Sequence, residues 1–94
     1  MRLLMKIPMP TASENPAVNA PGFETTLRDL FSRLGAEGRY SNRVDGRLYE
    51  YVLVNLGDLS QLTNIAEPVF QLLKVKPEFL PQVVPQPYYG RVGY

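Results

Sequence analysis

The sequence predicts an α+β domain: a four-stranded antiparallel sheet with two helices on one of its faces. Three observations support this prediction. Arg47–Leu56 (RLYEYVLVNL) is rich in β-branched and aromatic residues and lies between two turn signals. One apolar stripe with helical spacing precedes it, and a second follows it. The 94 residues are enough for one domain and too few for two independent cores.

The first strand is expected at Arg2–Ile7, because apolar and polar residues alternate there. The proline- and serine-rich segment after Pro8 predicts a loop. A helix should begin around Asn19–Pro21, with Asn19 as the N-cap and the proline in the first turn. It should end at Gly35, a residue that readily adopts a left-handed cap. Its expected apolar stripe consists of Phe23, Leu27, Leu30, Phe31 and Leu34.

A hairpin is predicted from Gly38–Val44 and Arg47–Leu56. Asp45 and Gly46 suit a two-residue type I′ turn, which needs positive φ at both positions. This turn predicts three cross-strand pairs: Val44 with Arg47, Asn42 with Tyr49, and Tyr40 with Tyr51. Alternation then separates the side chains into two faces, one with Tyr40, Asn42, Tyr49, Tyr51 and Leu53, the other with Arg39, Ser41, Arg43, Leu48, Glu50, Val52 and Val54.

The second helix should begin at Asp58, which forms a D-x-x-Q capping box with Gln61. Its apolar stripe is Leu59, Leu62, Ile65, Ala66, Val69, Phe70 and Leu73. Pro68 removes one backbone hydrogen bond and clashes with the carbonyl of Asn64, so a kink or two abutting helical pieces are expected near Asn64–Pro68.

A fourth strand is expected at Glu78–Val84, at a sheet edge because prolines cannot donate to a ladder. The single domain should span residues 1–86, followed by a Tyr- and Gly-rich tail at residues 87–94. The element order is then β-α-β-β-α-β, the ferredoxin-like pattern, whose sheet usually leaves one face open.

Composition removes several classes of function. The chain has no cysteine and no histidine, which excludes disulfides, thiol nucleophiles, Cys-based zinc sites and a Ser-His-Asp triad within one chain. We therefore expect no metal and no cofactor. A net charge of +1 gives no reason to expect binding to DNA or to an anionic membrane. The N-terminal apolar run is broken by Lys6 and Pro8, too early for a signal peptide, so a cytoplasmic protein is expected.

The segments MRLLMKIPMP, EGRYSNRVDGRLYEYVLVNL and DLSQLTNIAEPVF together resemble small uncharacterised bacterial proteins of the ferredoxin-like, dimeric α/β-barrel type. Ile65–Phe70 is the most distinctive piece, and the resemblance extends from Met1 to about Pro85. It implies a homodimer in which two open sheet faces meet. The wider superfamily includes cofactor-independent monooxygenases, muconolactone isomerase-like enzymes and haem-binding chlorite dismutases. A haem-ligating histidine has no counterpart in this chain.

The candidate ligand-binding residues are Lys6, Arg39, Glu50 and Gln82. If Leu3, Met5 and Ile7 face the helices, these four polar residues could lie on the open face and bind a small anionic ligand. The plainer interpretation is a Lys6–Glu50 or Arg39–Glu50 ion pair at a dimer interface. On this basis we expect Tyr51 and Leu53 to pack under the helices, and Leu4, Leu48, Val52, Val54, Leu80 and Val84 to form an apolar patch on the open face.

The tyrosines of the hairpin admit two interpretations. Arg47, Tyr49 and Val52, with an aromatic at Tyr51, partly match the RNA-recognition signature K/R-G-F/Y-G/A-F-V-x-F/Y. Packing in a core or dimer interface is the commoner role of such cross-strand aromatics. Glu67, before Pro68, is a further candidate for metal binding or general-base chemistry, or is simply solvated.

The function favoured by the sequence is a non-catalytic dimeric α/β module that binds a small ligand or a protein. The alternative is a cofactor-independent enzyme, monooxygenase- or isomerase-like, with a buried titrating group among Glu50, Glu67, Lys6 and the tyrosines. A more remote alternative is binding of single-stranded RNA on the open sheet face.

Overall fold

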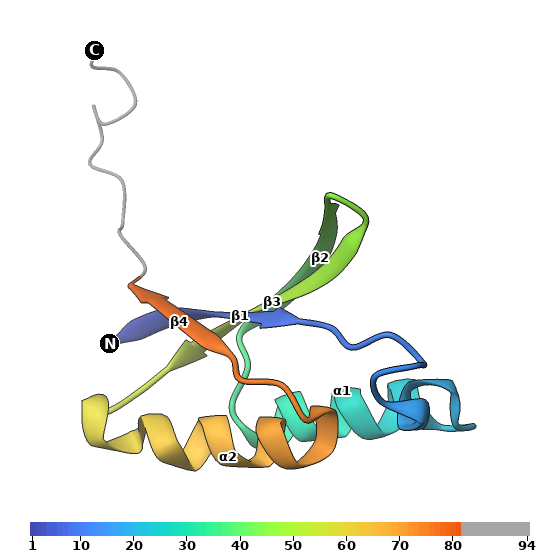
Figure 1. The fold of residues 1–94 in the computed structure, drawn as a ribbon. Helices are drawn as coiled ribbons and strands as arrows, with labels where there is room; N and C mark the ends of the chain where they lie inside the picture. Colours follow the sequence, from blue (N-terminus) through green and yellow to red (C-terminus); the bar gives the residue numbers. More distant parts are fainter. Residues whose placement is uncertain (82–94) are drawn as a thin grey trace.

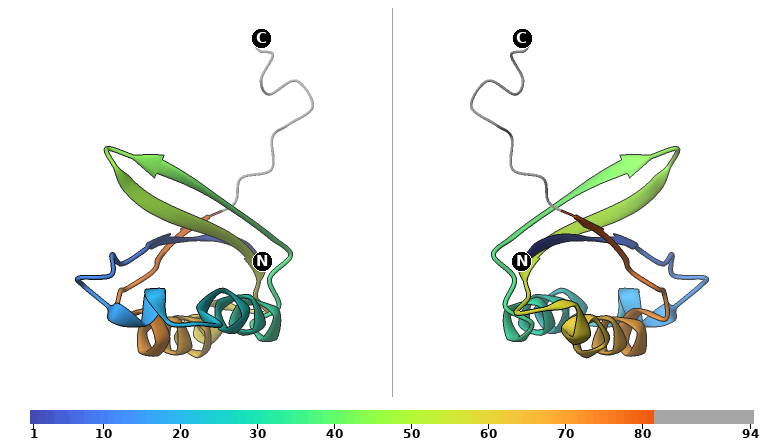
Figure 2. Two further views of the ribbon diagram at one scale, coloured as in Figure 1. Left: turned by 90° about the vertical axis from the view of Figure 1, so that its right-hand side faces the viewer. Right: turned by 90° about the vertical axis from the view of Figure 1, so that its left-hand side faces the viewer.

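The computed structural model of the chain describes residues 1–81, which form two layers. One layer is an antiparallel sheet with the strand order β2-β3-β1-β4. The strands are β1 (Arg2–Pro8), β2 (Gly38–Val44), β3 (Arg47–Asn55) and β4 (Glu78–Pro81). The other layer contains α1 (Phe23–Arg33) and α2 (Leu62–Leu73), both on the same face of the sheet (Figures 1 and 2). This open α+β sheet is consistent with a ferredoxin-like arrangement.

The core lies between the sheet and the helices. β1 contributes Leu3, Met5 and Ile7, and β3 contributes Val52 and Val54. The helices contribute Leu27, Leu30, Phe31, Ile65, Val69 and Leu73. The predicted apolar sides of the first strand and of both helices are therefore confirmed as core-facing, because each repeats with the period of its own element. Leu59 and Phe70 of the second stripe are exceptions, because they are 56% and 44% exposed.

The hairpin has the predicted register. Asp45 and Gly46 take φ values of 53° and 82°, the backbone that a type I′ turn needs. Val44 lies opposite Arg47, Asn42 opposite Tyr49 and Tyr40 opposite Tyr51. β3 lies between β2 and β1, so the central position expected for Arg47–Leu56 is also confirmed.

The entry to the first helix differs from the prediction. Asn19 does not cap α1; it ends a short 3₁₀ helix, η1 (Pro16–Asn19), and α1 begins later, after Gly22 with φ 82°. Asn15 caps η1 by accepting from the N–H of Ala17. Its amide nitrogen donates to the carbonyls of Leu72 and Leu73, which ties this loop to the end of α2. This tertiary contact of Asn15, rather than a local cap at Asn19, holds the segment that leads into α1.

The second helix is continuous through Pro68, so the division into two pieces near Asn64–Pro68 is wrong, whereas the alternative, a kink, stays a prediction. The helical segment divides earlier, where the 3₁₀ helix η2 (Leu59–Gln61) meets α2. Asp58 caps η2 by accepting from the N–H of Ser60, and Gln61 accepts from the N–H of Gly57 at 2.6 Å. Packing of the buried residues on both sides of the proline, Ile65 and Val69, offsets the lost backbone bond.

The prediction of which sheet face meets the helices is wrong for the hairpin. Ile7 lies opposite Glu50, and Met5 opposite Val52, so Glu50, Val52 and Val54 face the helices together with Leu48 and Arg39. Tyr51 and Leu53 lie on the open face instead, opposite Lys6 and Leu4. The error came from pairing Lys6 with Glu50. Of the expected apolar patch, Leu4 and Leu80 do lie on the open face.

β4 is an edge strand, as predicted, and pairs only with β1. The last predicted positions of this strand, Gln82 to Val84, lie outside the described residues, as does the tail at residues 87–94. Within residues 1–81, neither helix has the length and apolar content needed to cross a lipid bilayer.

Candidate functional site

The open sheet face is the principal candidate site. We define it by the side chains that point away from the helices on all four strands: Leu4, Lys6, Tyr40, Tyr49, Tyr51, Leu53, Glu78 and Leu80. Tyr40 is 56% exposed, and Tyr49, Tyr51, Leu4 and Leu53 are half-buried. No helix covers this face in the described chain (Figure 2).

Cross-strand neighbours organise the open sheet face into rows. One row is apolar and runs through Leu53, Leu4 and Leu80. The next row runs through Tyr40, Tyr51, Lys6 and Glu78. The face therefore combines an aliphatic strip with an adjoining aromatic and charged strip, a composition suited to contact with another molecule.

The tyrosines of this face interact with one another and with the lysine. The rings of Tyr40 and Tyr51 stack with centroids 4.9 Å apart and an interplanar angle of 9°. The Lys6 ammonium lies 4.9 Å from the centroid of the Tyr49 ring, a cation–π contact. This contact explains how Lys6 remains half-buried without the carboxylate partner that sequence reasoning assigned to it.

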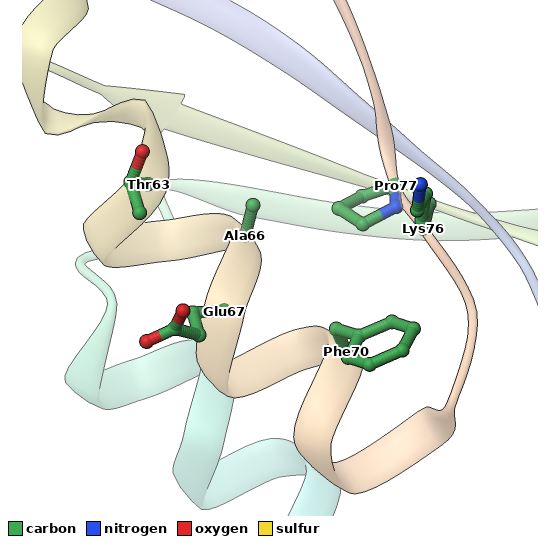
Figure 3. Close-up of a pocket in the computed structure, with 6 residues that line it drawn as sticks. All are labelled: Thr63, Ala66, Glu67, Phe70, Lys76 and Pro77. Carbon is green, nitrogen blue, oxygen red and sulfur yellow. The ribbon is translucent and has the colours of Figure 1, made fainter.

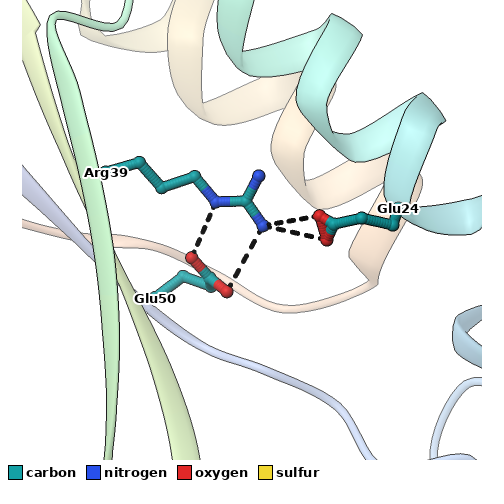
Figure 4. Close-up of polar contacts among 3 residues, drawn as sticks. All are labelled: Glu24, Arg39 and Glu50. Atoms are coloured by element: carbon teal, nitrogen blue, oxygen red, sulfur yellow. Dashed lines mark hydrogen bonds and ion pairs between the residues drawn. The ribbon is translucent and has the colours of Figure 1, made fainter.

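A second polar cluster lies on the opposite face of the sheet, between β2, β3 and α1 (Figure 4). Arg39 donates from Nε to Glu50 at 2.9 Å and from Nη2 to both oxygens of Glu24, at 3.1 and 3.0 Å. The hydrogen bond to Glu50 raises the pKa of the Arg39 guanidinium. The side chain of Glu50 is only 10% exposed, and that of Arg39 is 27% exposed. The guanidinium also lies over the ring of Phe31.

The four predicted ligand-binding residues do not form one cluster. Lys6 lies on the open sheet face, whereas Arg39 and Glu50 lie beneath α1. Gln82 is outside the described residues. The Arg39–Glu50 pair expected from the sequence does form, but it lies between two strands beneath α1, where the contact of Arg39 with Glu24 joins the sheet to the helix.

A groove of about 320 Å³ lies between α2 and the connection to β4 (Figure 3). Ala66, Phe70 and Pro77 form its apolar part, and Glu67 and Lys76 supply charged groups at its margin. Phe70 is 44% exposed. The sequence assigned Phe70 to the core stripe of the helix, and only its position at the margin of that stripe hinted at this groove. Among residues 1–81, no three acidic side chains are grouped as a metal site.

Glu14 joins the loop after β1 to the turn end of the hairpin. Its carboxylate accepts from the N–H of Thr11 at 2.9 Å and from Arg47 at 3.2 Å. The backbone hydrogen bond from Thr11, aided by Arg47, holds the pKa of Glu14 below its ordinary value of 4.5.

Because the folded-state pKa of Glu14 is depressed, its contribution to stability is present above pH 4.5 and is lost as the pH falls through the folded-state value. Urea denaturation between neutral and acidic pH should therefore show a steeper acid loss of stability for the wild type than for Glu14→Gln. Equal slopes for the two proteins would contradict this assignment.

Comparison of the chain with models of protein families, with curated proteins and with solved structures found no match. The functional argument therefore depends on the geometry of the described residues.

Proposed function

We propose that the chain is a ferredoxin-like, non-catalytic module that forms a homodimeric α/β barrel through its open sheet face, and that it binds a small ligand or a protein in this state. The observation that carries the proposal is a sheet with helices on one side only. Its other side holds apolar and aromatic side chains that a monomer leaves half exposed. Contiguous apolar surface of this kind marks interaction sites.

The charges of this face suit a second copy of the same chain. Lys6 and Glu78 are cross-strand neighbours, so their row carries one positive and one negative group. Two such rows can therefore face each other across a twofold axis without an excess of like charge. The apolar row of Leu4, Leu53 and Leu80 can pack against its own symmetry mate. The face is thus complementary to itself in both charge and hydrophobicity.

Binding of single-stranded RNA is a second candidate, favoured by one observation. Tyr49 and Tyr51, at the aromatic positions of the RNA-recognition signature, lie on the open face and are partly accessible. The balance of charge weighs against it. Lys6 has Glu78 beside it, and Arg47 is paired with Glu14, whereas a nucleic-acid groove needs unpaired cations along the backbone.

The catalytic alternative finds its best candidate in Glu50, a buried carboxylate between the layers. This residue accepts two hydrogen bonds from Arg39, at 2.9 and 3.4 Å. A carboxylate held by a guanidinium in this way is one half of a structural ion pair. The geometry therefore favours the non-catalytic module.

Sedimentation equilibrium on the full chain tests the proposal. Leu53→Glu places a charge in the apolar row, and we expect the dimer dissociation constant to rise roughly 100-fold, since a central interface residue contributes about 2–4 kcal/mol. Thr25→Glu, on the exposed side of α1, is the matched control and should leave the constant unchanged. Circular dichroism verifies that both variants fold.

A monomeric wild-type protein at micromolar concentration would contradict the proposal. If that monomer also bound a labelled oligouridylate at low salt, and Tyr51→Ala abolished the binding, single-stranded RNA would replace the second copy as the partner of this face.

A further inference from the structure

The β2–β3 hairpin extends beyond the rest of the sheet. β1 accompanies β3 only as far as the pair Pro8–Tyr49, so the end of the hairpin has no strand beside it. Figure 1 shows this end rising away from the helices. All seven residues of β2 are exposed. On the β3 side the loop after β1 contacts this extension, through Met9 and Glu14. The exposed β2 side is available to another molecule.

Arg43 lies in this extension with its side chain on the helix side of the sheet, because alternation places it with Arg39. Among residues 1–81, the side chain makes one hydrogen bond, to the nearby carbonyl of Gly46 at 3.3 Å. Glu67, at the margin of the groove on α2, is exposed as well. Within the described part of the chain, neither residue takes part in an ion pair.

The two free edges of the sheet are β2 and β4. A twofold axis that runs along the strands, between β3 and β1, places the edge β2 of one copy beside the edge β4 of the other. In an antiparallel arrangement, the end of β2 lies next to the start of β4, where Pro77 forms one wall of the groove. Pro77 and Pro81 carry no N–H, so side chains rather than a full ladder must hold these edges together.

We propose that in the dimer Arg43 of each copy docks into the α2 groove of the other. Its aliphatic stem packs on Ala66 and Phe70, and its guanidinium lies over the Phe70 ring and pairs with Glu67. This contact rests on the proposed function, because it forms only when the open faces meet. It covers Phe70, one of the most exposed large apolar side chains of residues 1–81.

Sedimentation equilibrium with charge-reversal variants tests this contact. Arg43→Glu and Glu67→Arg are each expected to raise the dimer dissociation constant about tenfold, and the double variant R43E/E67R to recover most of the loss. Arg28→Glu, on the exposed side of α1, is the control for net charge and should have no effect.

A second pair of variants removes the apolar part without changing charge. Phe70→Ala should weaken the dimer, whereas Leu59→Ala, equally apolar and 56% exposed but outside the groove, should not. Thermal unfolding verifies that all variants remain folded. If the wild type dimerises and both Arg43→Glu and Phe70→Ala leave the constant unchanged, this inference is overturned and the proposed function stands. A wild type that is monomeric overturns both.

Discussion

Replacing Arg39 with alanine is expected to destabilise the fold by about 3 kcal/mol, the lower end of the range for a broken buried ion pair. The physical reason is that Glu50 would remain between the layers with its charge uncompensated. Its side chain is only 10% exposed, and both of its side-chain hydrogen bonds come from Arg39. We expect the lower end of this range because the Arg39 side chain is 27% exposed. Water can therefore replace part of the hydrogen bonding that the guanidinium gives to Glu50.

Urea denaturation at a fixed protein concentration measures this effect. Arg39→Ala combined with Glu50→Leu should recover most of the lost stability, because the double variant buries no unpaired charge. Arg28 lies on α1 and has no ion pair among residues 1–81, so Arg28→Ala should change the free energy of unfolding by less than about 0.5 kcal/mol. A double variant as unstable as Arg39→Ala would show that the pair is not the source of the effect.

Met5→Ala is expected to cost about 2–5 kcal/mol, the usual range for a large apolar side chain truncated in a core. Met5 has no exposed surface and lies between Val52 and Phe79 on the neighbouring strands. The loss combines the transfer free energy of the missing atoms with the cavity that they leave. It should be independent of protein concentration, because Met5 faces the helices of its own chain.

Leu4→Ala is the matched control, one residue away on the opposite face of the same strand. Leu4→Ala should lower the free energy of unfolding by less than Met5→Ala does. This loss should grow with protein concentration, since the contact that the variant removes belongs to the dimer. Denaturation curves at several concentrations distinguish the two variants. Equal, concentration-independent losses at Met5 and Leu4 would mean that both sheet faces are internal to the monomer, contrary to the arrangement described above.

The candidate site was predictable in part. The placement of Arg39 and Glu50 on one face and the alignment of Tyr40 with Tyr51 follow from the two-residue turn, because a type I′ turn sets every later pair of the hairpin. The contact of Glu24 with Arg39 was not predictable, since it depends on where α1 crosses the sheet. The groove beside Phe70 also needed the path of the connection to β4, which no local pattern encodes.

By itself, the sequence determined the features that depend on near neighbours along the chain. The type I′ turn at Asp45 and Gly46, the cap at Asp58 and the left-handed residue Gly35 each follow from backbone preferences within a few residues. The apolar sides of β1 and of both helices could also be predicted, because in each element the apolar residues recur mainly on one side.

Only the tertiary structure decided which face of the hairpin is buried. Both faces of β3 carry apolar residues, so alternation divides them into two sets without choosing between them. The choice depends on how the ionised groups are compensated. Glu50 can be buried because Arg39 of the same hairpin compensates its charge, and Glu24 of α1 holds that guanidinium between the layers. Lys6 remains on the open side against the ring of Tyr49. These contacts join residues from different elements, and their free energies exist only once the elements have packed.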